Sequence, residues 1–361
     1  MDISKKHLFI VLAETAAIIA AGLGALAVYG TVQSNKIPEM SFRDCLDYTL
    51  SDEKNAVITI GTIKDGVQSY TVYGENSEIL PDEAHDYEIG SLTKTLTAAL
   101  ANKAADDALI SLDSPVDEYL DLPEKTHYPT VKELVTHTSG YKPYYFESPM
   151  TGNFLNGRND FCGIGDSMVK NRLAKIDIAD REYRFNYSNF GYASLGLILE
   201  NVYSTEFTTL MDSYLHDDLG LENTHISECN GDLDNYWEWT AGDTYLSAGG
   251  VVSDIEDMLS YAQMQLDGSH GFDRCHDLIC NINASSESYK KMGINMDGIA
   301  MAWIIDSENG FIWHNGGTGS YNAYLGVCPE KGSAVVILSN LPPNSKIPST
   351  VLGAKLLKEI S

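Results

Sequence analysis

The sequence predicts an α/β protein of the α+β type, built around one mostly antiparallel sheet. Strand-like segments rich in β-branched residues occur in residues 56–89 and again in 299–338, whereas the long stretch between them has mainly helical periodicity. Strands from both ends of a chain can share one sheet when helices cover its faces. We therefore expect helices to flank the sheet and a helical lobe to be inserted between its two halves.

The first elements of this domain are a helix, a hairpin and a short extended piece. Ser41 is a good helix N-cap, and Asp65-Gly66 is typical of a tight hairpin turn. The expected elements are a helix at 41–50, strands at 56–63 and 67–73, and an extended piece at 87–89.

The remaining elements follow from a change of period along the chain. Apolar residues recur at helical spacing through the middle, and alternating segments separated by turn residues return near the end. The expected elements are helices at 91–105, 192–202 and 255–266, strands at 299–306, 311–314, 321–328 and 333–338, and a closing helix at 351–360.

The N-terminus differs from the rest of the chain. Residues 8–28 form an apolar run that contains a single charge, Glu14, and two lysines precede it. This length suits a membrane-spanning helix, which needs about 20 apolar residues. The small-x-small pattern at 25–27 also suits a cleaved secretory signal, so both interpretations stay open, with the anchor favoured by the length of the run.

These features divide the chain and place it in the cell. Lysines before an apolar run keep that end inside the cell, so the remainder is expected outside the cytoplasm, anchored to the membrane by the N-terminal helix or secreted, in a bacterium. The predicted parts are an anchor or signal at 1–30, a polar tether at 31–40, and one domain at 41–361.

Composition excludes several classes of partner. With 24 Lys and Arg against 51 Asp and Glu, the net charge of −27 would repel nucleic acid. The nine histidines and six cysteines show no metal-ligand spacing, and no strand–GxGxxG–helix unit is present, so we expect neither a metal nor a cofactor. Cys275 and Cys280 are the best candidates for a local disulfide, although unpaired buried thiols are an equal alternative.

The first candidate for chemistry is the pair Ser91 and Lys94 at the start of a predicted helix. Residues three apart lie on one helical face, so the hydroxyl and the amine are within reach of each other. A serine needs a base to become a nucleophile, and a lysine can be that base if burial lowers its pKa. The apolar helix that follows, 95–100, indicates that Lys94 is buried, where an unpaired charge is costly.

Two further segments contain residues suited to the same chemistry. Tyr187 can carry a proton if the charge of Lys94 lowers the tyrosine pKa, and Asn189 can contact a substrate carbonyl and hold the lysine. The glycine-rich segment 314–319, between two predicted strands, allows a strand edge to approach a ligand and offers a backbone N–H for an oxyanion hole.

In this order, the serine, lysine, tyrosine and glycine-flanked strand resemble the penicillin-binding protein and class C β-lactamase superfamily. Three other stretches strengthen the resemblance, which covers about residues 55 to 340. They are LVTHTSG at 134–140, RFNYSN at 184–189 and GGVVSDIEDM at 249–258.

The resemblance implies a role for each matching residue. Ser91 would be the acylated nucleophile, and Lys94 and Tyr187 would transfer protons. Asn189 would contact the substrate amide, and the N–H groups of Ser91 and Gly317 would form the oxyanion hole. His137 and Ser139 would be structural. The segment with His314, Gly316 and Gly317 would bind substrate.

The glycine-rich segment at 314–319 departs from the family pattern. Many β-lactamases have Lys-Thr-Gly where this chain has His314-Asn315-Gly316, and a mostly neutral histidine is less suited to holding a substrate carboxylate. Efficient β-lactam hydrolysis is therefore not expected. The favoured function is a peptidase or amidase for substrates that contain D-amino acids, of D-aminopeptidase or D-Ala carboxypeptidase type. The alternatives are a carboxylesterase with the same residues and a non-catalytic β-lactam sensor or scaffold.

Overall fold

The computed structural model describes residues 36–227 and 231–361. The predicted anchor or signal at 1–30 lies outside these ranges, as does the first half of the predicted tether, residues 31–35. None of the helices in the described part of the chain is both long and apolar enough to cross a bilayer.

One eight-stranded antiparallel sheet forms the centre of the molecule, as the sequence predicted. Its strand order is β2-β1-β11-β10-β9-β8-β7-β6, so the N-terminal hairpin pairs with the last strand of the chain. The strands are β1 (Ile58–Lys64), β2 (Val67–Tyr73), β6 (Cys280–Asn281), β7 (Gly298–Ile299), β8 (Ile304–Asp306), β9 (Phe311–Gly317), β10 (Asn322–Cys328) and β11 (Ser333–Ser339). The central strands β10 and β11 are buried along their whole length, whereas the edge strand β2 is exposed or half-buried at every residue except Val72.

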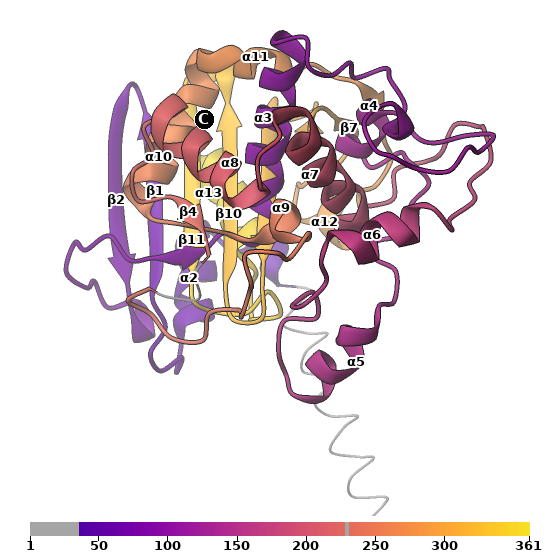
Figure 1. Ribbon diagram of the computed structural model, residues 1–361. Helices are drawn as coiled ribbons and strands as arrows, with labels where there is room; N and C mark the ends of the chain where they lie inside the picture. Colours follow the sequence, from indigo (N-terminus) through magenta and orange to yellow (C-terminus); the bar gives the residue numbers. More distant parts are fainter. Residues whose placement is uncertain (1–35, 228–230) are drawn as a thin grey trace, which may run out of the picture.

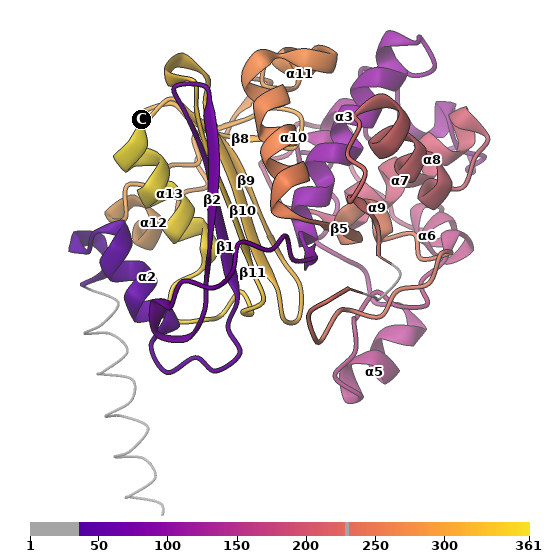
Figure 2. The ribbon, with the colours of Figure 1, turned by 90° about the vertical axis from the view of Figure 1, so that its left-hand side faces the viewer.

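Helices cover both faces of this sheet. The termini supply α2 (Phe42–Leu50) and α13 (Ser349–Ile360), which lie together on one face, and α10 (Ile255–Asp267) packs on β1 and β11 from the other (Figure 2). Ser41 caps α2 as predicted, in a reciprocal capping box with Asp44.

The helical lobe lies beyond α10 (Figures 1 and 2). Its helices are α3 (Thr93–Asp106), α4 (Val131–Val135), α5 (Ser148–Leu155), α6 (Asp166–Leu173), α7 (Asn189–Tyr203), α8 (Phe207–Ser213) and α9 (Leu246–Gly249). The short helix α11 (Phe272–Cys275) lies between α10 and β6, and α12 (Glu287–Lys291) lies in the connection between β6 and β7. A second, three-stranded sheet has the order β3-β5-β4, from Tyr87–Glu88, Val251–Ser253 and His225–Ile226.

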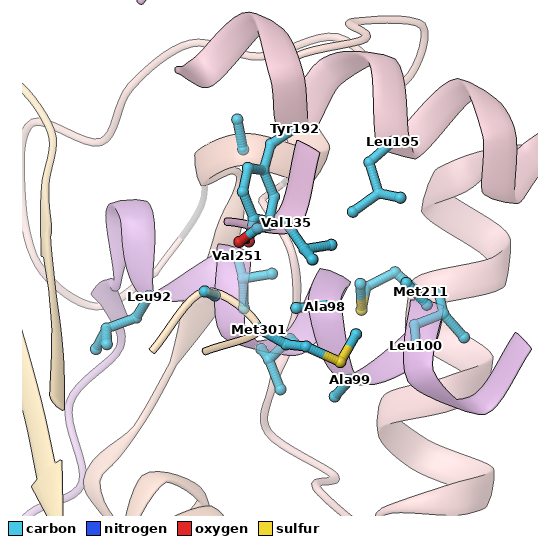
Figure 3. Packing of buried hydrophobic residues seen from close by; sticks show 14 of the residues in the cluster. Leu92, Ala98, Ala99, Leu100, Val135, Tyr192, Leu195, Met211, Val251 and Met301 are labelled. Atoms are coloured by element: carbon cyan, nitrogen blue, oxygen red, sulfur yellow. The ribbon is translucent and has the colours of Figure 1, made fainter. Parts of the chain in front are cut away.

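The core of the lobe is centred on α3. Its buried face, which includes Ala98 and Leu100, meets Tyr192 and Leu195 of α7 and Val251 of β5 (Figure 3). The Tyr192 hydroxyl donates to the Val135 carbonyl at 3.0 Å, which satisfies its polar end inside the core. Because α3 is buried almost all round, its first turn is held rigidly against its neighbours.

One expected strand is wrong, and one of the two alternatives left open for Cys275 and Cys280 holds. The strand predicted at 299–306 is a hairpin, β7 and β8, because Ala302 has φ +69° and the N–H groups of Met301 and Ala302 bond to the Cys275 and Val135 carbonyls instead of a ladder. Cys275 and Cys280 form no disulfide. Both are free thiols, and burial raises the pKa of Cys275 to about 12.

Candidate active site

Ser91 lies in a single 3₁₀ turn, Gly90–Leu92, between β3 and α3. Helix α3 therefore begins two residues later than the sequence suggested. Gly90 has φ +50°, and a Cβ there would lie 2.6 Å from the Gly317 backbone nitrogen. Only glycine tolerates both this conformation and the close approach of the Gly317 backbone. The turn that contains Ser91 therefore lies directly against the end of β9.

Lys94 faces Ser91 from the first turn of α3. Its side chain is fully buried, and Nζ donates to Ser91 Oγ at 3.1 Å and to the Ala248 carbonyl at 2.6 Å. Burial lowers the pKa of Lys94 well below its usual value. The lysine is thus favoured in its neutral form, in which it can accept a proton from Ser91.

Tyr187 packs over the same amine. Lys94 Nζ lies 4.9 Å from the centroid of the Tyr187 ring, and the Tyr187 hydroxyl is buried without a hydrogen bond of good geometry in the described structure. Burial raises the pKa of Tyr187, which the nearby Ser91 hydroxyl opposes only in part. The expectation that the Lys94 charge lowers this pKa is therefore wrong, because burial disfavours that charge.

His137, which the resemblance marked as structural, contacts this tyrosine directly. Its ring lies 4.4 Å from the Tyr187 ring, centroid to centroid, and its Nδ1 accepts the Ser188 N–H at 3.1 Å. Burial and the neighbouring Lys94 lower the pKa of His137 well below its usual value. A neutral ring is required for that acceptor, so His137 fixes the position of Tyr187.

The glycine-rich end of β9 forms the opposite wall. A Cβ at Gly316 would overlap the Ile89 carbonyl oxygen, so this glycine permits β9 to touch the turn that holds Ser91. Asn322 of β10 fixes the strand, since its Nδ2 donates to the Gly316 carbonyl at 2.6 Å.

His314 lies behind this strand end and is 2% exposed. Its Nδ1 is 2.7 Å from the Asn315 carbonyl oxygen, so Nδ1 carries the hydrogen of the neutral ring. Burial and Lys94 lower the pKa of His314 to about 3. His314 therefore offers no positive charge near neutral pH.

Ser91 lines a small cavity of about 60 Å³. Asn189, the first residue of α7, lines it together with Ser91 and Gly317, as predicted. The predicted contact of Asn189 with Lys94 is absent from the lysine's hydrogen bonds, which go to Ser91 and Ala248. The other lining residues are Phe161, Trp237, Trp239, Tyr245, Ala248 and Gly249.

Sequence reasoning missed the aromatic wall and one acidic group, Glu88. The Glu88 carboxylate accepts the Thr318 hydroxyl at 2.6 Å and the Trp237 N–H at 2.7 Å, and it is 2% exposed. Burial raises the pKa of Glu88 to about 7. The sequence could have indicated a buried acid here, because Glu88 is flanked by apolar residues in the short strand before Ser91.

Together these residues supply a hydroxyl that lines the cavity, a neighbouring amine whose charge is disfavoured, and a buried phenol beside that amine. Such a set can transfer an acyl group to Ser91 without a metal ligand. Across residues 36–227 and 231–361, no group of three or more His, Cys, Asp or Glu side chains is placed to hold a metal ion.

The chain is similar in sequence to part of several known bacterial proteins. The chain is 22% identical over 282 residues to Protein flp of Staphylococcus aureus strain N315, covering 71% of this chain and 53% of that protein. It is 28% identical over 165 residues to a β-lactamase of Providencia stuartii, covering 45% and 40%. A probable fimbrial assembly protein FimD of Dichelobacter nodosus is 30% identical over 132 residues, covering 36% and 32%. The chain thus spans about a third to a half of these relatives.

Solved structures share the fold at low identity. A β-lactamase/D-alanine carboxypeptidase of Yersinia pestis superposes with a TM-score of 0.69 at 19% identity, covering 91% of this chain and 99% of that one. An octameric penicillin-binding protein homologue of Pyrococcus abyssi gives 0.65 at 20% identity, covering 94% and 76%. The family model described as Beta-lactamase matches residues 54–350, nearly the whole described domain. The chain therefore belongs to the Beta-lactamase family, with the fold of class C β-lactamases and penicillin-binding proteins.

Proposed function

We propose that the chain is a serine hydrolase that forms an acyl-enzyme at Ser91. The observation that carries this proposal is the 3.1 Å contact between Ser91 Oγ and the buried amine of Lys94. A neutral Lys94 accepts the Ser91 proton while Oγ attacks the substrate carbonyl carbon. The N–H groups of Ser91 and Gly317 then stabilise the oxyanion.

The second half of the reaction returns the protons. As the bond to the leaving group breaks, the proton held by Lys94 passes to the leaving nitrogen or oxygen through the Tyr187 hydroxyl. Water then attacks the acyl carbon and gives a proton to the same pair. As the bond between the acyl carbon and Ser91 Oγ breaks, that proton passes to Oγ, which releases the acid and restores the Ser91 hydroxyl. His137 keeps the Tyr187 ring in place through direct ring contact.

The substrates we propose are peptides or amides that contain D-amino acids. The residues that line the catalytic cavity include no lysine or arginine, and His314 is buried and neutral. A substrate carboxylate therefore gains little there, which favours an aminopeptidase or amidase over a β-lactamase or a carboxypeptidase. The aromatic wall of Phe161, Trp237 and Tyr245 supports a carboxylesterase as the second candidate.

Intact-mass measurement after incubation with a fluorophosphonate and with a penicillin tests the nucleophile. We expect one phosphonyl adduct on the native chain and none on Ser91→Ala, with Ser69→Ala, an exposed serine of β2, as the matched control. No adduct on the folded native chain would refute the proposal. A permanent penicillin adduct without turnover would instead favour a sensor. Turnover of a D-Ala amide and of a nitrophenyl ester, compared as kcat/KM, separates the two enzyme functions.

We also propose that the domain acts outside the cytoplasm, because two lysines precede the apolar run at 8–28. Protease treatment of intact cells that express the full chain tests this placement. Digestion of the domain without lysis is expected, and protection until lysis would contradict it.

A further inference from the structure

A second hollow adjoins the catalytic cavity and is almost wholly apolar. It has a volume of about 280 Å³ and lies between α5 and the segments that precede and follow this helix. An engineered apolar cavity of about 150 Å³ is large enough to take benzene. This hollow therefore has room for an aromatic ring with a few added carbons. The lining residues are Tyr144, Phe146, Met150, Thr151, Phe154, Asp160 and Phe161.

The side chains around this hollow are unusually exposed for their type. Of the eight large hydrophobic residues exposed in the described ranges, three line the hollow, namely Tyr144, Phe146 and Phe154, and Phe154 is 76% exposed. Helix α5 projects from the body of the lobe in both Figure 1 and Figure 2. Apolar surface gathered in one place marks a binding site more often than a scattered set does.

Phe161 joins the hollow to the catalytic cavity, because it lines both. On one side its ring is in edge contact with Tyr144, with centroids 6.4 Å apart. On the other side it stacks on Tyr245 at 4.3 Å, and Tyr245 also lines the cavity with Ser91. A continuous aromatic wall thus leads from the hollow to the nucleophile.

Polar contacts behind the hollow hold it open. Asn153 of α5 donates to the Cys162 carbonyl at 2.7 Å. Arg172 of α6 pairs with Glu147 at 2.7 Å and also donates to the Phe146 carbonyl. Because these bonds anchor both ends of the segment to the lobe, the hollow exists before a ligand arrives.

From these contacts we propose that the hollow binds an apolar substituent of the substrate, an aromatic ring or a short alkyl chain, while Ser91 attacks the carbonyl. The inference rests on the proposed hydrolase function and specifies its substrate class. A stable protein–protein interface buries about 800 Å² of accessible surface on each partner, which is more than one short helix offers. An anionic membrane surface would be repelled by the net charge of −27.

The test measures how fast Ser91 reacts with ethyl and hexyl fluorophosphonates in the native chain, Phe154→Ser and Leu155→Ser. Phe154 lines the hollow, whereas Leu155 is equally exposed on the same helix and does not, which makes it the matched control. We expect the native chain to prefer the hexyl probe by about tenfold or more, Phe154→Ser to lose most of this preference, and Leu155→Ser to keep it.

A second arm locates the substituent. Nitrophenyl acetate and hexanoate vary the acyl side, and the acetates of phenol and 4-hexylphenol vary the leaving group. A chain-length preference that Phe154→Ser reduces in one series assigns the hollow to that side of the scissile bond.

The outcomes separate this inference from the proposed function. If neither fluorophosphonate labels the folded chain, the hydrolase function fails. If both label Ser91 at rates independent of chain length and of Phe154, the hydrolase stands and the hollow does not bind substrate. Equal effects of both variants on vesicle binding or oligomeric state, with unchanged probe preference, would identify a docking face and likewise overturn the inference.

Discussion

Lys94 Nζ lies 3.1 Å from Ser91 Oγ inside a fully buried first turn of α3, and its other hydrogen bond goes to a carbonyl oxygen of Ala248. A buried ammonium without a carboxylate among its hydrogen-bond partners is costly, so burial shifts the lysine toward the amine. The same burial that makes Lys94 a poor cation makes it a usable base at neutral pH.

Replacing Lys94 with Met should lower the rate of Ser91 acylation by about 10²- to 10⁴-fold, the usual contribution of a general base. Lys94→Arg should not restore the rate, since a guanidinium stays protonated. Lys103→Met, on the same helix but partly exposed, is the control. Stopped-flow acylation by a nitrophenyl ester measures the effect, and near-native rates in Lys94→Arg would exclude the lysine as the base.

Tyr187→Phe should damage amide hydrolysis more than hydrolysis of a nitrophenyl ester. Burial raises the pKa of Tyr187, so the residue is a neutral phenol that can pass a proton to the leaving group. An amine needs that proton to depart, whereas nitrophenolate does not. We expect the loss in kcat for a D-Ala amide to exceed that for the ester by about tenfold. Equal losses for both substrates would indicate a role other than protonation of the leaving group.

Glu88→Gln should make the protein more stable at alkaline pH and have little effect near pH 4. The folded pKa of about 7 exceeds the ordinary value of 4.5, so the folded state holds this proton longer than the unfolded state does. The contribution of this group to the free energy of unfolding is complete below about pH 4.5 and is lost as the pH rises through 7. The loss amounts to about 3 kcal/mol. Glutamine mimics the protonated acid, which can still bond both Thr318 and the Trp237 N–H.

Urea unfolding of the native chain, Glu88→Gln and the exposed control Glu124→Gln, at pH 5 and pH 8, measures this difference. The native chain and the control should both lose stability between the two pH values relative to Glu88→Gln. Parallel pH dependence in all three proteins would show that Glu88 does not titrate in this range.

Much of the fold followed from the sequence because its strands are regular. The runs at 56–63 and 333–338 lie within two residues of β1 and β11, since β-branched residues in a central strand leave few other structures. Ser91, Lys94, Tyr187 and Gly317 could be grouped through motif order. In the structure Ser91 and Gly317 line one cavity, and Lys94 contacts both Ser91 and Tyr187.

Other features depend on contacts that no local pattern contains. The turn between β7 and β8 exists because Met301 and Ala302 bond to carbonyls 26 and 167 positions away in the chain, at Cys275 and Val135. The two-residue strand β4 pairs with β5 but is too short to show a period. The apolar hollow beside α5 arises from side chains left uncovered, and periodicity reports which residues are apolar, not which of them stay exposed.

Gly316→Ala should abolish acylation and destabilise the fold by about 1–3 kcal/mol, the usual cost of overpacking a core. An alanine Cβ at this position would overlap the Ile89 carbonyl oxygen, so β9 would have to move away from the turn that holds Ser91. Gly242→Ala, where a Cβ meets nothing within 4 Å, is the control and should behave as the native chain. Fluorophosphonate labelling measures acylation, and urea unfolding measures stability. Full labelling of Gly316→Ala would show that contact between β9 and the Ser91 turn is not needed for the reaction.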